Sequence, residues 1–107
     1  MGELYLFVKW HYDYDKEGTW FDEEDGEDTY PLIQGARHSL PRLFRKEFEI
    51  RSVSLEDGIA TAEIYADYHT TIVTEGKTAT AHASASYSAA GDSVHQSLAM
   101  EITILRK

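Results

Sequence analysis

Apolar and polar residues alternate along most of the chain from Glu47 onward. Strict alternation is typical of β-strands that bury one face and expose the other. The dipeptides between the alternating runs favour tight turns, and the first is a strong hairpin signal. These turns are Asp57-Gly58, Glu75-Gly76 and Gly91-Asp92. The pattern predicts an antiparallel meander with strands at residues 47–56, 59–73, 77–89 and 93–105.

Two-residue turns fix which residues of neighbouring strands lie opposite each other. With turns at Glu75-Gly76 and Gly91-Asp92, apolar residues of three strands fall on one face and polar residues on the other. The apolar face of the middle strand carries only small residues, namely Ala79, Ala81, Ala83, Ala85 and Ala89. Apolar positions change phase between Ile50 and Val53, which predicts a β-bulge near Arg51-Ser52.

The first half of the chain predicts one strand and one helix. Alternation of apolar residues from Leu4 to Tyr12 indicates a strand over residues 3–14. A stripe with approximately helical spacing then predicts a helix over residues 31–46, in which Gly35 and Pro41 introduce a kink. The stripe consists of Leu32, Ile33, Ala36, Leu40, Leu43 and Phe44.

These elements predict a single α+β domain over residues 1–107. We expect an antiparallel meander of four to five strands, curved around one short kinked helix. The order β-α-β-β-β-β is similar to that of cystatin-like and hot-dog folds. Both architectures host many functions, so the likeness implies none in particular.

Charge is concentrated in one short segment. The formal net charge is −9, and residues 13–28 contribute −8 of it through nine carboxylates and one lysine. Such a segment repels nucleic acid and anionic membranes and favours basic partners or cations. The chain has no cysteine, no signal-peptide pattern in MGELYLFVKW and no run of about 20 apolar residues. We therefore expect a cytoplasmic protein.

The stretch DYDKEGTWFDEE at residues 13–24 is similar in spacing to a calcium loop. Asp13, Asp15, Gly18 and Glu24 occupy positions that an EF-hand loop requires. The flanks alternate like strands rather than helices, which favours an acidic loop or hairpin over residues 15–28. Calcium binding by the 13–24 loop remains an alternative.

A second candidate site comes from the inferred register of the meander. It places His69, His82 and Glu101 in one row, with Cβ atoms of neighbours ~5 Å apart. Two imidazoles and a carboxylate at that spacing could bind zinc or act as an acid–base pair. A solvated sheet face with no site explains the same residues.

Basic residues cluster just after the acidic segment. We expect them to neutralise it within the chain; contact between two copies in a homodimer and anion binding are alternatives. The cluster consists of Arg37, Arg42, Arg45, Lys46 and Arg51.

Two large aromatic residues, Trp20 and Phe21, lie between carboxylates. They either fold back onto the core or anchor a partner. Our functional hypothesis is a non-enzymatic binding protein, inhibitor-like or immunity-like, that presents the acidic segment to a basic protein surface. A divalent-metal protein and a ligand binder or enzyme with a pocket between helix and sheet are alternatives. The residues expected to contact the partner are Asp13, Asp15, Trp20, Phe21, Asp22, Glu23, Glu24 and Asp25.

Overall fold

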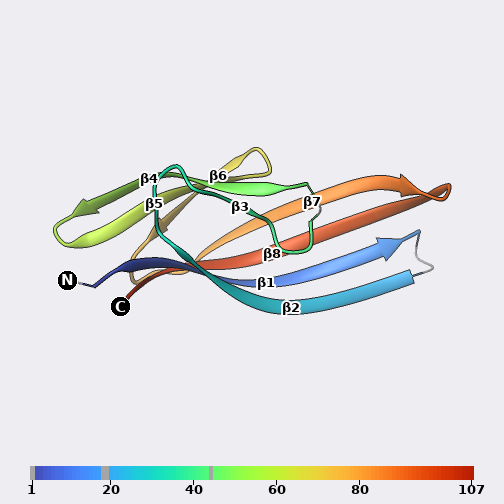
Figure 1. Cartoon of the computed structure of the whole chain (residues 1–107). Helices are drawn as coiled ribbons and strands as arrows, with labels where there is room; N and C mark the ends of the chain where they lie inside the picture. Colours follow the sequence, from blue (N-terminus) through green and yellow to red (C-terminus); the bar gives the residue numbers. More distant parts are fainter. Residues whose placement is uncertain (1, 18–19, 44) are drawn as a thin grey trace.

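A computed structural model describes residues 2–17, 20–43 and 45–107, and these residues form eight strands and no helix (Figure 1). The α+β prediction is therefore wrong, and with it the cystatin-like or hot-dog-like order. The prediction of antiparallel sheets is confirmed. The strands are β1 Leu4–Lys16, β2 Trp20–Pro31, β3 Arg37–Ser39, β4 Glu47–Glu56, β5 Ile59–Ala66, β6 His69–Thr74, β7 Ala79–Ala89 and β8 Asp92–Arg106.

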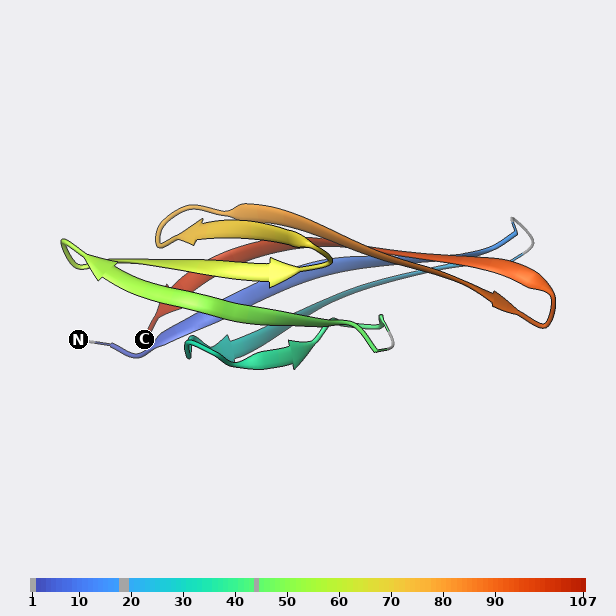
Figure 2. The same ribbon diagram turned by 90° about the horizontal axis from the view of Figure 1, so that it is seen from above.

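The strands form two four-stranded antiparallel sheets that lie face to face. One has the order β2-β1-β8-β7 and the other the order β3-β4-β5-β6. The β1–β2 and β7–β8 hairpins extend beyond the end of the second sheet (Figure 2). β1 and β8 pair along their lengths, from Leu4 opposite Arg106 to Lys16 opposite Val94. This pairing joins the first and last strands of the chain.

Alternate residues of both sheets point inward and form one hydrophobic core. Leu6 and Ile102 from one sheet and Ile50 and Val73 from the other are each at most 1% exposed. The space between the sheets includes a void of about 10 Å³, which is of the order of a single water molecule. The described residues of 31–46 form no helix, so the predicted pocket between helix and sheet lacks one of its two walls.

The segment predicted as a kinked helix is irregular apart from β3. Gly35, Arg42 and Arg45 have positive φ angles of 88°, 66° and 65°, which an α-helix excludes. The backbone bonds to β4 instead: Gly35 N donates to Ile50 O, and Ile50 N donates to Ala36 O. Leu40 is still buried in the core. The apolar stripe therefore marks Leu40 and Leu43 correctly as core residues but not Ile33, which is 59% exposed, and not the backbone conformation. Phe44 lies outside the described residues.

The predicted Asp57-Gly58 hairpin and the predicted bulge are both confirmed. Glu56 pairs with Ile59 across a turn in which Asp57 and Gly58 have φ angles of 53° and 77°. The register of β4 against β5 shifts between Ile50 and Ser52. The bulge explains why inward-facing positions change phase along β4.

The expected strand over residues 59–73 is instead two strands. Asp67 and Tyr68, with φ angles of 49° and 67°, form a turn that pairs Ala66 with His69. The turn reverses the chain, and Ile72 in the new strand is 55% exposed. Glu75 and Gly76 connect β6 to β7 in the other sheet and do not form a hairpin.

The last turn lies one residue earlier than predicted, at Ala90-Gly91 rather than Gly91-Asp92. This changes the register by two residues, so each side chain keeps its predicted face but changes its partner. Ala79 lies opposite Ile102 instead of Ile104.

Polar contacts from loops join the two sheets at their ends. Arg106 of β8 donates to both carboxylate oxygens of Glu75, at 2.8 and 2.9 Å, and to the carbonyl of Gly58. Hydrogen bonds from Arg106 and from the Ala60 amide lower the pKa of Glu75 to about 2. Asp67 accepts from the Ser84 amide of β7 and from Lys46.

Trp10 and Gly26 fix the position of β2 against β1. They lie opposite each other, the indole covers Gly26, and Nε1 of Trp10 donates to Asp28 at 3.0 Å. A Cβ atom on Gly26 would lie 2.6 Å from Cε2 and 2.8 Å from Cη2 of Trp10. A side chain at this position would therefore displace the indole.

We expect Gly26→Ala to destabilise the protein by ~1–3 kcal/mol, as overpacking does. Without the indole, alanine would be the better residue inside a strand. Denaturant unfolding measures the change, and Trp10→Val provides the control because it removes the indole while keeping a residue suited to a strand. If Gly26→Ala is equally harmful in the Trp10→Val background, Trp10 does not cover Gly26 as described.

Candidate functional site

The 13–24 stretch forms a hairpin, as the flanking alternation favoured. β1 pairs with β2 up to Lys16 opposite Trp20. The carboxylate of Glu17 accepts a hydrogen bond from the backbone amide of Ser93 at 2.7 Å, and so joins the end of β1 to β8. Asp13 and Glu24 lie on opposite faces of the hairpin, where Asp13 contacts His11 and Glu24 pairs with Arg42. Among the described residues of this stretch, the ligand arrangement of an EF-hand is therefore not formed; Gly18 lies outside them.

Most of the acidic segment is the edge strand β2, and this is the candidate functional site. β2 is the end strand of its sheet (Figure 1), with β1 on one side and, among the described residues, no paired strand on the other. We call the six carboxylates of this strand the acidic edge. The acidic edge consists of Asp22, Glu23, Glu24, Asp25, Glu27 and Asp28.

Strand alternation distributes the acidic edge over both faces of the sheet. Glu23, Asp25 and Glu27 lie on the outer face, opposite outward residues of β1. The other three lie on the inner face, where sequence-distant groups contact two of them. Glu24 binds Arg42, and Asp28 accepts from Trp10. Both faces of this edge are therefore negative.

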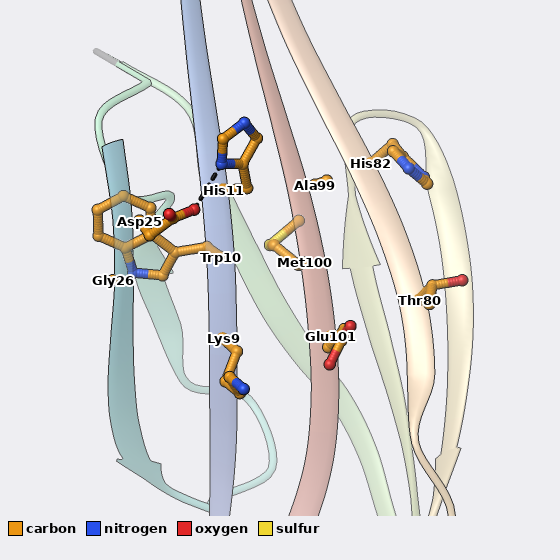
Figure 3. Close-up of a pocket in the computed structure, with 10 residues that line it drawn as sticks. All are labelled: Lys9, Trp10, His11, Asp25, Gly26, Thr80, His82, Ala99, Met100 and Glu101. Carbon is orange, nitrogen blue, oxygen red and sulfur yellow. Dashed lines mark hydrogen bonds and ion pairs between the residues drawn. The ribbon is translucent and has the colours of Figure 1, made fainter. Parts of the chain in front are cut away.

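His11 lies among three carboxylates on the outer face (Figure 3 shows its contact with Asp25). Nδ1 of His11 is 2.5 Å from Asp25 Oδ1, directly across the β1–β2 pair. Nε2 is 3.2 Å from Asp13 and 3.4 Å from Glu23. The imidazole therefore contacts carboxylates from both strands of the hairpin.

The hydrogen bond to Asp25 raises the pKa of His11 above its ordinary value, and the charges of Asp13, Asp25 and Glu23 act in the same direction. Partial burial opposes the increase. A protonated His11 offsets part of the repulsion among these carboxylates. A neutral His11 that donates from Nδ1 to Asp25 leaves the Nε2 lone pair directed at Asp13 and Glu23.

His11, Asp13 and Glu23 also match the requirements of a cation site. One ligand atom from each lies within 4.8 Å of the others. Tetrahedral zinc with bonds of ~2.1 Å has ligands ~3.4 Å apart, close to the separations from Nε2 to the two carboxylates. Asp25 would orient the imidazole, as second-shell carboxylates do at zinc sites.

The predicted row of His69, His82 and Glu101 is not formed. His69 and His82 are separated because β6 and β7 belong to different sheets. In the β7–β8 hairpin, His82 lies opposite Ala99 and Glu101 lies opposite Thr80. His69 and His82 do line one surface hollow, and His82 and Glu101 line another with His11 (Figure 3). The strand register from which a metal site at these three residues was predicted is therefore wrong.

Of the two aromatic residues at the hairpin tip, the structure describes the side chain of Phe21 but not that of Trp20. Phe21 is 62% exposed on the outer face, so folding back onto the core is wrong for this residue. The side chain of Trp20 lies outside the described part of the structure. Phe21, Asp15 and His95 line one surface hollow with serines of β7 and β8.

The basic cluster neutralises the acidic edge through Arg42, which pairs with Glu24. Other members pair elsewhere, since Lys46 contacts Asp67 and both Arg37 and Arg51 contact Glu49. The expectation that the cluster neutralises the acidic segment is confirmed for Arg42.

Sequence reasoning missed His11, although the signal was present. Outward positions of the first strand include His11 and Asp13, and the register of β1 against β2 places His11 opposite Asp25. The predicted loop or hairpin over residues 15–28 did not assign this register.

Comparisons with protein-family models, curated proteins and solved structures gave no match. Within the described residues, no helix is long and apolar enough to cross a bilayer. The site geometry therefore carries the functional argument alone.

We expect His11 to make stability depend on pH. Because its pKa is raised on folding, its stabilising effect is complete below pH ~6.5 and is lost as pH rises through the folded-state pKa. Denaturant midpoints across this range should show a decline that His11→Gln lacks. NMR titration should place the His11 pKa above that of His11 in an Asp25→Asn variant; equal values would contradict the role of Asp25.

Proposed function

We propose that this chain is a non-enzymatic binding protein that presents the acidic edge to a basic surface of a partner protein. The observation that carries this proposal is that six carboxylates occupy one edge strand, whose open side pairs with no other strand in the part of the chain that the structure describes. These six carboxylates carry −6 of the formal net charge of −9. The electrostatic field is therefore directed from one edge of the molecule.

A one-sided negative field favours rapid encounter with a basic partner. Complementary charge increases association rates and suppresses partners of like charge, nucleic acids included. Exposed Phe21 lies on the outer face next to the carboxylates. An aromatic side chain beside charged residues suits an interface, because the ring contributes burial while the charges guide approach.

The rival functions have less support. The void of about 10 Å³ in the core does not admit a substrate or small ligand. A homodimer through β2 would place carboxylates against carboxylates, so self-association would need another surface. A cytoplasmic location remains a prediction from the sequence.

A lysine-rich peptide of 12 residues tests the proposal, with association measured in a stopped-flow instrument. Raising ionic strength from about 0.01 M to about 0.15 M shortens the Debye length from about 30 Å to about 8 Å. We expect the association rate to fall about tenfold or more. A rate that ignores ionic strength would contradict the proposal.

Matched variants localise the effect to the acidic edge. The edge variant combines Asp22→Asn, Glu23→Gln and Glu27→Gln. The control combines Glu47→Gln, Glu56→Gln and Glu63→Gln, which changes net charge equally at exposed positions of the other sheet. We expect the edge variant to weaken binding far more than the control; equal losses would mean that total charge, and not this edge, binds the peptide.

Divalent-cation binding is a second candidate function, favoured by the proximity of His11, Asp13 and Glu23. These residues replace both sets predicted from the sequence. Ligands of one nitrogen and several carboxylate oxygens suit zinc better than calcium, which prefers oxygen alone.

Calorimetric titration with zinc and with calcium tests this candidate. We expect zinc to bind, with affinity rising as pH rises because protons compete for Nε2. His11→Gln should abolish the heat, whereas the control His95→Gln, on the same face, should retain it. Absence of zinc heat, or equal effects of the two variants, would reject the site.

A further inference from the structure

We propose that the partner adds an extended, basic strand to the open side of β2 and so becomes a fifth strand of the sheet β2-β1-β8-β7. This inference rests on the proposed function and specifies its binding mode. The partner segment would alternate, with Lys or Arg at every second residue on at least one face. Backbone hydrogen bonds would supply affinity, and the acidic edge would select for charge.

The fold leaves β2 as the long edge available for such pairing. β2 has 12 residues, whereas the edge strands of the other sheet, β3 and β6, have three and six. The remaining edge, β7, is partly occupied, because Asp67 accepts from the amide of Ser84. Native proteins keep exposed edges short or otherwise blocked, and the feature that protects β2 along most of its length is its charge.

Charge determines which strand can pair here. On the outer face, Glu23, Asp25 and Glu27 recur at every second residue, so they would lie opposite alternate residues of an added strand. Opposite charges across a strand pair stabilise it, and like charges destabilise it. A second copy of β2 is therefore rejected, while a basic strand is accepted.

The inner face already binds one cationic side chain. Arg42 pairs with Glu24 there, although it reaches the edge from a loop of the other sheet. Next to Glu24, Gly26 has no side chain, and the ring of Trp10 covers it. A partner Arg or Lys opposite Gly26 would therefore lie beside the indole and between Glu24 and Asp28, two carboxylates that favour a cation.

The experiment uses three synthetic peptides of 12 residues in which Arg and Thr alternate. One is unmodified, one is N-methylated at every Arg and one at every Thr, so that net charge is constant while donors on one peptide edge are lost. We expect one methylated peptide to bind about tenfold or more weakly than the unmodified peptide, because several backbone hydrogen bonds are lost. In the same samples, NMR measures amide exchange along β2.

Strand addition predicts that the unmodified peptide slows exchange at alternate β2 amides, those not bonded to β1. If all three peptides bind equally and β2 exchange is unchanged, the strand-addition inference is wrong while charge-based binding stands. If no peptide binds at low ionic strength, the proposed function fails as well. The edge variant described above should lose both affinity and protection.

Discussion

The pairing of β1 with β8 is the constraint on which the rest of the structure depends. It joins the two ends of the chain from Leu4 opposite Arg106 to Lys16 opposite Val94. Because β8 occupies one side of β1, β2 pairs on the other side and is the end strand of the sheet. The acidic residues therefore lie at an edge of a sheet whose central strands, β1 and β8, bury a largely apolar face.

The acidic strand forms despite its composition. Asp and Glu are depleted in β-strands, and like charges along one edge repel each other. Register with β1, the cover of Trp10 over Gly26 and the charges of His11 and Arg42 offset this cost. Where a natural sequence violates such local preferences, the positions concerned are often functional. This conflict between composition and structure is the physical reason for assigning a binding role to β2.

Parts of the fold could be predicted because their signals are local. Asp57-Gly58 specifies a tight turn by its chemistry, and the phase change near Ser52 reveals the bulge. The Asp67-Tyr68 turn could not be recognised, because tyrosine rarely adopts a positive φ and no glycine marks the reversal. The apolar spacing of residues 31–46 fits a helix and also fits an irregular segment that packs on the core. Its backbone hydrogen bonds to β4 depend on tertiary contacts, which the local sequence does not reveal. The His11 site required a strand pairing across residues that looked like a loop.

Amide hydrogen exchange of the protein alone, resolved along residues 20–31, tests the central claim most directly. If β2 is paired on one side and open on the other, slow and fast amides should alternate along it, since only every second amide bonds to β1. Uniformly slow exchange would mean that another segment covers the edge. Uniformly fast exchange would mean that the acidic segment is not a strand, and either result would contradict the account.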